Sequence, residues 1–417
     1  MSNLRIGMLV GITSDSPHGI FESKMRDDEA FSVEQDTRGW MLQWRNLPLP
    51  VVHLAVRSVA TVITVDDTRT TAAVAVRATS QNLLERIQVR VEPDASALVV
   101  EWKTTIGILW GKYIVEVLLP PQALMSVTYA GTDSLVVPPR ALRRSPDSPL
   151  ILRSTATGSL YVDDDDMLVA LSLHVQVRKS GRVQLQAPGL RVADSIHFDN
   201  QGSGALVAVV PLIATARMDV SNAKSGTCAI VASKTAAIRD ALNVVNFGSG
   251  VTSVEFGGTV AAPSIMTTAA SSGSLHLTCG LCGVSSMRTR LSGSGQICIA
   301  GNGVVEHHAI DNTSSGSIYV DGIAATSCIA NTHGSGSIYV PPAQHTTSTS
   351  IRPRVLAFDG VLAAPRRPSV KRVPSTRPAT LFVIGTMFED DPFVDIPETA
   401  AAAAPREISV SMTFETG

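Results

Sequence analysis

The chain of 417 residues is poor in aromatic side chains, in charge of one sign and in long apolar runs. Phe, Trp and Tyr together make up 5% of the residues, and the formal net charge at pH 7 is −2. This charge balance gives no indication of a nucleic-acid partner or of binding to a charged membrane surface. No stretch of 18 or more apolar residues occurs, so the sequence predicts no membrane-spanning helix.

Cysteines are also few, and their number is odd for a chain of this length, which does not fit a disulfide scaffold and favours a reducing compartment. The apolar run over residues 6–12 is short and interrupted by Gly7 and Gly11, so we predict no secretory signal. We therefore expect an intracellular protein or one assembled into a particle, with the cell surface, reached by a non-classical route, as the alternative.

A five-residue unit recurs along the middle of the chain at even spacing. Residues 316–320 read Gly-Ser-Ile-Tyr-Val, and the same five residues return at 336–340. Related units, each a turn residue followed by a short strand, begin at Asp133, Gly158, Gly181, Gly204, Gly226, Thr252, Gly273 and Gly295. The spacing between these units is too short for a propeller blade, and the units lack the leucine-rich-repeat consensus. The spacing fits one coil of a parallel β-solenoid.

The pattern within each unit predicts which side chains face the core. Strand side chains alternate between two faces, so the apolar third and fifth residues of each unit are expected to point inward and stack as ladders. The fourth residues should point outward, and the leading glycine should supply the backbone freedom of a tight corner. We predict an all-β protein with a parallel β-helix of about ten coils over residues 131–345.

The flanking regions differ from the repeat. Residues 1–46 form an extension with a possible strand, and residues 47–130 are expected to be a β-rich cap with strands within 58–65, 71–78, 87–92, 97–104 and 112–118. Residues 346–405 indicate a Pro/Arg-rich linker. In residues 406–417 the apolar side chains alternate strictly with polar ones, which predicts a strand that docks on the N-terminal region near residues 6–12 (Ile408, Val410, Met412, Phe414).

The chain resembles the auto-transporter adhesin head GIN domain family, a family of uncharacterised function. The resemblance rests on the repeated Gly-Ser-(Leu/Ile)-Tyr-Val unit and on a lead-in of short apolar strands, and it covers about residues 47–345 (Thr61 to Val65, Leu83 to Val89, Leu98 to Val100, Val115 to Pro120, Ala130 to Asp133). It implies a right-handed β-helix with a binding or structural role. It carries over no catalytic residue.

Two groups of residues suggest metal or redox chemistry, each with a plainer interpretation. Cys279 and Cys282 have CxxC spacing, but a zinc site needs further ligands, for which the nearby candidates are Cys298, Cys328, His307 and His308. We interpret these as ordinary solenoid cysteines, with an adventitious metal or a redox role as alternatives. The four carboxylates of residues 163–166 could hold Ca²⁺, or they are simply a solvated turn.

The outward residues of the repeat are the remaining candidates for binding. Aromatic side chains on a flat sheet can bind sugars or partner proteins, so four outward residues are possible binding residues: Tyr161, His276, Tyr319 and Tyr339. A carbohydrate-active enzyme would instead need carboxylates at a fixed separation, which the outward positions lack. We expect a non-catalytic structural or interaction protein without a cofactor, self-assembling or part of a particle such as a virion. The alternative is a polysaccharide-binding or polysaccharide-cleaving β-helix.

Overall fold

The computed structural model describes residues 40–92, 96–103, 111–342, 347–348, 354–358, 362 and 370–372. It also gives the backbone of residues 5–8, 20–21, 32–35, 346 and 378–383. The chain forms two compact units, residues 1–120 with 374–417 and residues 121–373, which are described one at a time.

The first unit contains a mixed sheet with the strand order β1–β29–β10–β7–β4–β3–β2, and β6 pairs in parallel with β10. Its strands are β1 (Arg5–Met8), β29 (Pro378–Val383), β10 (Lys112–Leu119), β7 (Ala73–Ala78), β4 (Met41–Asn46), β3 (Ser32–Gln35), β2 (Ile20–Phe21) and β6 (Thr61–Val65). A separate group joins β5 (His53–Arg57), β9 (Ala97–Trp102) and β8 (Ile87–Glu92). All five strands expected between residues 58 and 118 are therefore present.

Strands β2, β3, β4 and β5 of this unit were not predicted individually, and neither were a short helix and strand β29. Residues 81–86 form the short helix α1 (Gln81–Arg86), which Ser80 caps by accepting a hydrogen bond from the backbone N–H of Leu83, and Leu83 and Leu84 are buried. Strand β29 falls within the range expected as a linker, and it pairs antiparallel with β1. The predicted strand at 406–417 lies outside the described residues.

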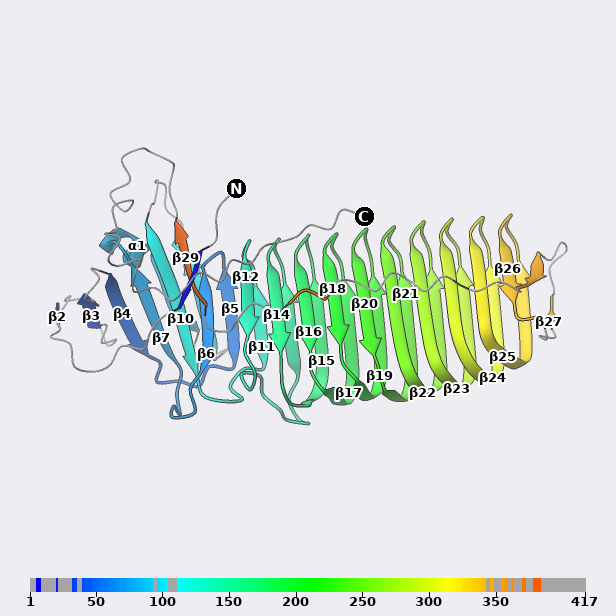
Figure 1. The fold of residues 1–417 in the computed structure, drawn as a ribbon, viewed down its shortest axis with the longest axis horizontal. Helices are drawn as coiled ribbons and strands as arrows, with labels where there is room; N and C mark the ends of the chain where they lie inside the picture. Colours follow the sequence, from blue (N-terminus) through cyan, green and yellow to red (C-terminus); the bar gives the residue numbers. More distant parts are fainter. Residues whose placement is uncertain are drawn as a thin grey trace. The chain divides into compact units, whose positions relative to one another are not determined.

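The second unit is a stack of coils, each one turn of the solenoid (Figure 1). Each coil contributes to three sheets, and the ten expected strands form the first of them. They pair in parallel in chain order and span about nine turns. These strands are β12 (Ser134–Val137), β14 (Ser159–Asp163), β16 (Arg182–Gln186), β18 (Ala205–Val209), β20 (Thr227–Ala232), the first parts of β22 (Val251–Ala269), β23 (Ser274–Leu291), β24 (Gln296–Asn312) and β25 (Ser317–Thr332), and β26 (Ser337–Val340). One more short strand, β28 (Val355–Ala357), pairs in parallel with β26.

Each long strand bends through three faces of the coil. In β22 the pairing with β23 shifts register between residues 256 and 259, and it is interrupted at Pro263, which has no N–H to donate. Residues 251–256, 259–262 and 264–269 thus belong to a first, a second and a third sheet. The remaining strands of the stack are β11 (Ser126–Tyr129), β13 (Leu150–Ser154), β15 (Leu168–Val177), β17 (Gly189–Asn200), β19 (Leu212–Asn222), β21 (Thr235–Asn246) and β27 (Thr346–Thr347).

The apolar third and fifth residues of the repeat fill the core, as predicted. Ile297, Ile318 and Ile338 are fully buried. One unit was assigned two residues too late: Val251, rather than Ser253, pairs with Ser274, so the unit begins at Gly250. A slip of two residues keeps the same side chains inward, which is why Val254 and Phe256 are still buried.

The leading glycines are needed for a different reason from the one expected. They form a ladder in which a Cβ atom on one glycine would collide with the carbonyl oxygen of the leading glycine one coil earlier, as for Gly316 over Gly295 and Gly336 over Gly316. None of these leading glycines has a φ in the left-handed region. Close approach of the backbone, and not backbone freedom, therefore excludes a side chain there.

A ladder of buried asparagines lies four residues before the leading glycines, at Asn200, Asn222, Asn246 and Asn312. Each side-chain amide donates one hydrogen bond to the carbonyl of its own leading glycine and a second to a carbonyl in the next coil. These bonds satisfy main-chain oxygens that the corner would otherwise bury without partners. The sequon at Asn312 is thus part of the corner, with its amide nitrogen bonded inside the fold.

Candidate functional site

The four predicted binding residues share one outward column of the first sheet. The register runs in order through Tyr161, Gln184, Val207, Ala229, Ser253, His276, Cys298, Tyr319 and Tyr339. Tyr161 lies five coils from His276, whereas Tyr319 and Tyr339 are adjacent. The structure therefore brings only Tyr319 and Tyr339 together.

Tyr319 and Tyr339 stack on neighbouring coils. Their ring centroids are 4.7 Å apart and the ring planes differ by 4°. Phe358 stands edge-on to both rings, with centroid distances of 5.8 Å to Tyr319 and 6.4 Å to Tyr339. The aromatic pair is thus already in contact with a side chain from beyond the last coil, and each tyrosine ring is half-buried.

The same column is covered elsewhere as well. Tyr161 is only 5% exposed, and Val207 and Ala229 are buried although the register turns them outward. The side-chain amide of Gln184 exchanges two hydrogen bonds with the main chain of Lys371, at 2.7 and 3.0 Å. The fourth residues thus point outward, as predicted, but the column is not a free surface, because Lys371 and Phe358 of the same chain contact it.

Burial affects the one histidine of the column. His276 is half-buried on the outer face, and desolvation lowers the pKa of its imidazole. The neutral ring is therefore favoured near neutral pH, which removes the cationic character that an anion-binding site would need.

The outer face of the third sheet carries a row of polar residues that the sequence reasoning missed. His174, His197, Asp219 and Asn243 occupy equivalent positions on four neighbouring coils. They follow the leading glycines by 15 to 17 residues, so a comparison of whole coils, and not only of the glycine-led strand, would have found them.

Asp219 is the centre of this row, which we call the polar row. Its carboxylate accepts hydrogen bonds from Asn243 Nδ2 at 2.6 Å and from Arg217 Nε at 2.9 Å, and its Oδ2 lies 3.2 Å from His197 Nδ1. The rings of His174 and His197 are edge-on at 6.1 Å. Burial, followed by the charge of Arg153, lowers the pKa of His174. The polar row therefore presents hydrogen-bond donors and acceptors along the outer face of the third sheet.

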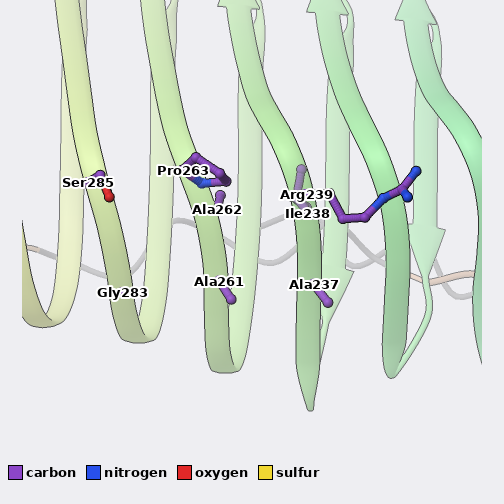
Figure 2. A pocket seen from close by; sticks show the side chains of 8 residues that line it. All are labelled: Ala237, Ile238, Arg239, Ala261, Ala262, Pro263, Gly283 and Ser285. Carbon is purple, nitrogen blue, oxygen red and sulfur yellow. The ribbon is translucent and has the colours of Figure 1, made fainter.

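A shallow hollow of about 390 Å³ lies on the second sheet near its junction with the third (Figure 2). Its floor is made mainly of small residues of neighbouring coils, including Ala237, Ala261 and Gly283, with Pro263 at its edge. The Arg239 side chain lies along the face and donates a hydrogen bond of 2.9 Å to the carbonyl oxygen of Ala193. The hollow is thus open and mostly apolar.

The cysteine pair lies inside the solenoid. Cys279 and Cys282 are buried and reduced. Their mutual hydrogen bond, and then burial, raise the pKa of the Cys279 thiol. Among the residues that the structure describes, no three His, Cys, Asp or Glu side chains are grouped so as to hold a metal ion.

The acidic run at residues 163–166 is more than a solvated turn. Arg144 bridges two of its carboxylates, with 2.6 Å to the buried Asp164 and 2.7 Å to the exposed Asp166. Desolvation is the main influence on Asp164 and raises the pKa of its carboxyl, against the Arg144 charge. The guanidinium of Arg144 thus pairs with two of the four carboxylates and makes this run an ion-paired corner.

Comparisons with known proteins give structural likeness only, since no family model and no curated protein matches the chain. A "putative adhesin" from Parabacteroides distasonis has a TM-score of 0.42 and 15% identity, over 62% of this chain and 96% of its own. A "putative lipid binding protein" from the same species has 0.35 and 14%, over 72% and 96%. A "putative adhesin" from Parabacteroides merdae also has 0.35 and 14%, over 72% and 95%. Similarity at this level carries no argument about function.

No helix in the described part of the chain is long and apolar enough to cross a membrane.

Proposed function

We propose that this protein is a non-catalytic interaction protein that associates with its own copies through the outer face of the second sheet. The observation that carries the proposal is the exposure of this face. Its outward column, residues 237, 261, 283, 304 and 324, consists of small or apolar residues that are all exposed, and Val304 is 59% exposed. Leu281 beside it is 52% exposed.

Physical chemistry favours covering such a face. Apolar surface removed from water contributes roughly 25 cal/mol per Å², and contiguous exposed apolar patches mark interaction sites. Side chains of one or a few carbon atoms leave the sheet flat, and a flat, rigid, repetitive face fits a second copy of itself about a two-fold axis. The shallow hollow between coils could receive a projecting side chain such as Leu281.

Mass photometry over a concentration series tests this proposal. We expect the native chain to populate dimers or larger assemblies at micromolar concentration, and the double variant Ala261→Asp/Val304→Asp to raise the dissociation constant at least tenfold. Ser286→Asp, an exposed substitution on the third sheet, is the matched control and should associate like the native chain. A native chain that stays monomeric, or a double variant that associates normally, would contradict the proposal.

The polar row supports a second candidate function, the binding of a polysaccharide. Its donors and acceptors repeat at the strand spacing of about 4.8 Å along four coils, which suits a ligand with hydroxyl groups along its length. Affinity electrophoresis in gels containing neutral or uronate polysaccharides tests it: Asp219→Ala should abolish any retardation, and Asp240→Ala, an exposed carboxylate outside the row, should preserve it. An assay for new reducing ends would separate binding from cleavage.

A further inference from the structure

Gln184 binds a polypeptide backbone from the outer face of the first sheet. Its Nε2 donates to the carbonyl oxygen of Lys371 at 2.7 Å, and its Oε1 accepts from the backbone N–H of Lys371 at 3.0 Å. Both main-chain groups of one residue are thus paired by a single side chain, as they would be by a neighbouring strand. We call Gln184 the main-chain clamp, because these hydrogen bonds involve only backbone atoms of the bound residue and do not depend on its side chain.

A second anchor for the same segment lies near the end of the stack. Strand β28 pairs with β26, and Phe358 packs against the rings of Tyr319 and Tyr339. Gln184 and Tyr319 are six coils apart in the register, or about 29 Å at a strand spacing of about 4.8 Å. The thirteen residue steps from Phe358 to Lys371 reach about 43 Å when extended, which is enough to connect the two anchors.

The face between the anchors is suited to being covered. Val207 and Ala229 turn outward yet are fully buried, and Ser253 is 8% exposed. If this face were uncovered, Val207 and Ala229 would form an exposed apolar strip, and without Lys371 the polar groups of Gln184 would lose these hydrogen bonds. The column therefore combines an aromatic anchor, an apolar floor and a main-chain clamp in one line.

We propose that this column, from Gln184 to Tyr339, is a binding site for an extended polypeptide strand, and that residues 354–372 of a second copy fill it in trans. In the monomer the chain's own β28, Phe358 and Lys371 contact the two ends of this column. A second copy's segment would form identical hydrogen bonds and ring contacts, and such exchange is a low-cost route to association. The proposal does not depend on the second-sheet face.

A synthetic peptide of residues 354–372, labelled with fluorescein and followed by fluorescence anisotropy, tests the site on the full chain. In the native protein the tethered segment competes with the peptide. Phe358→Ala removes the aromatic anchor of the tethered segment, so this variant should bind the peptide at least tenfold more tightly than the native chain. The double variant Phe358→Ala/Gln184→Ala should bind the peptide at least tenfold more weakly than Phe358→Ala alone. The control Phe358→Ala/Gln296→Ala, which changes an exposed glutamine of the same sheet, should bind the peptide as tightly as Phe358→Ala.

A second readout uses the single variant Gln184→Ala. Trypsin cleaves after Lys371 only when this backbone leaves the clamp, so cleavage there should be severalfold faster in Gln184→Ala than in the native chain or in Gln296→Ala. Absence of peptide binding by every variant, or equal binding with and without Gln184, would overturn the proposal. The variant Ala261→Asp/Val304→Asp separates the two surfaces, because it should lose association through the second sheet and keep peptide binding.

Discussion

The side-chain amide of Asn246 donates a hydrogen bond of 2.9 Å to the carbonyl oxygen of Gly250, four residues further along the same corner. The same nitrogen also donates to Ser274 in the next coil at 3.0 Å, and Asn246 Oδ1 accepts from the N–H of Gly248 at 3.1 Å. One side chain thus closes its own corner and ties that corner to the following one. The asparagine ladder is therefore a stacking device as well as a turn device.

We predict that Asn246→Ala destabilises the solenoid by about 1–3 kcal/mol, because it removes three hydrogen bonds, two of them buried, and takes a partner from main-chain groups inside the corner. Asn302→Ala is the matched control. Asn302 is exposed and makes one bond of 3.3 Å to Gly280, so its loss should change the free energy of unfolding by less than about 0.5 kcal/mol. Urea denaturation followed by circular dichroism measures both, and equal stability of the two variants would contradict the ladder's role.

The glycine ladder gives a prediction based on space alone. A methyl group on Gly316 would meet the carbonyl oxygens of Gly295 and Gly293, while one on Gly283 would lie 3.8 Å from its nearest neighbour, the carbonyl oxygen of Val260. Gly316→Ala should therefore lower stability by about 1–3 kcal/mol through overpacking, and Gly283→Ala should be neutral or slightly stabilising. The difference in melting temperature between these two variants is the measurement, and similar values would show that the corner can relax.

The repeat was sufficient to predict the stack of coils. Alternation of side chains is a period-two signal, so Ile297, Ile318 and Ile338 could be placed in the core from the sequence, and even the misassigned unit at Gly250 kept Val254 and Phe256 inward. Helix α1 and strand β29 were missed because each is short and has no repeat to support it. The role of the leading glycine was misjudged because contacts between coils are not visible in one unit.

The candidate sites were harder to predict than the fold. The sequence placed Tyr319 and Tyr339 on adjacent rungs, which their 4.7 Å stacking confirms. It did not indicate that Phe358 and Lys371 return to this face, because those contacts join residues up to 187 positions apart and have no local pattern. The polar row escaped notice for another reason: only the glycine-led strand was compared between coils, and His197 and Asp219 lie on another sheet.

The five cysteines should be unreactive in the folded protein: Cys279 and Cys282 are protected by burial, although their mutual hydrogen bond lowers the pKa of the Cys282 thiol, and the other three are poorly ionised. Burial raises the pKa of the Cys298 thiol and that of the Cys328 thiol to about 11 each, and Cys228 is completely buried. At pH 8 only about one thiol in a thousand with such a pKa is ionised, and the thiolate is the reactive form. Ellman's reagent should therefore react slowly with the native protein and quickly with all five thiols in urea. Rapid reaction of one thiol in the folded state would show an opening of the coil that carries it.

His308 should make the stability of the solenoid depend on pH. Its ring is buried, with Nε2 3.0 Å from Thr289 Oγ1, and burial lowers the pKa of the imidazole from 6.5 to about 4. Between these two values the unfolded chain binds a proton that the folded chain does not, so stability is complete above pH 6.5 and falls as the pH drops towards 4. The loss of stability amounts to about 3 kcal/mol.

Urea denaturation from pH 7 to pH 4 measures this effect. The extra loss should appear in the native chain and in the control His307→Gln, which alters an exposed ring, and it should be absent in His308→Gln. Parallel pH profiles for all three proteins would mean that His308 is protonated in the folded state with little penalty.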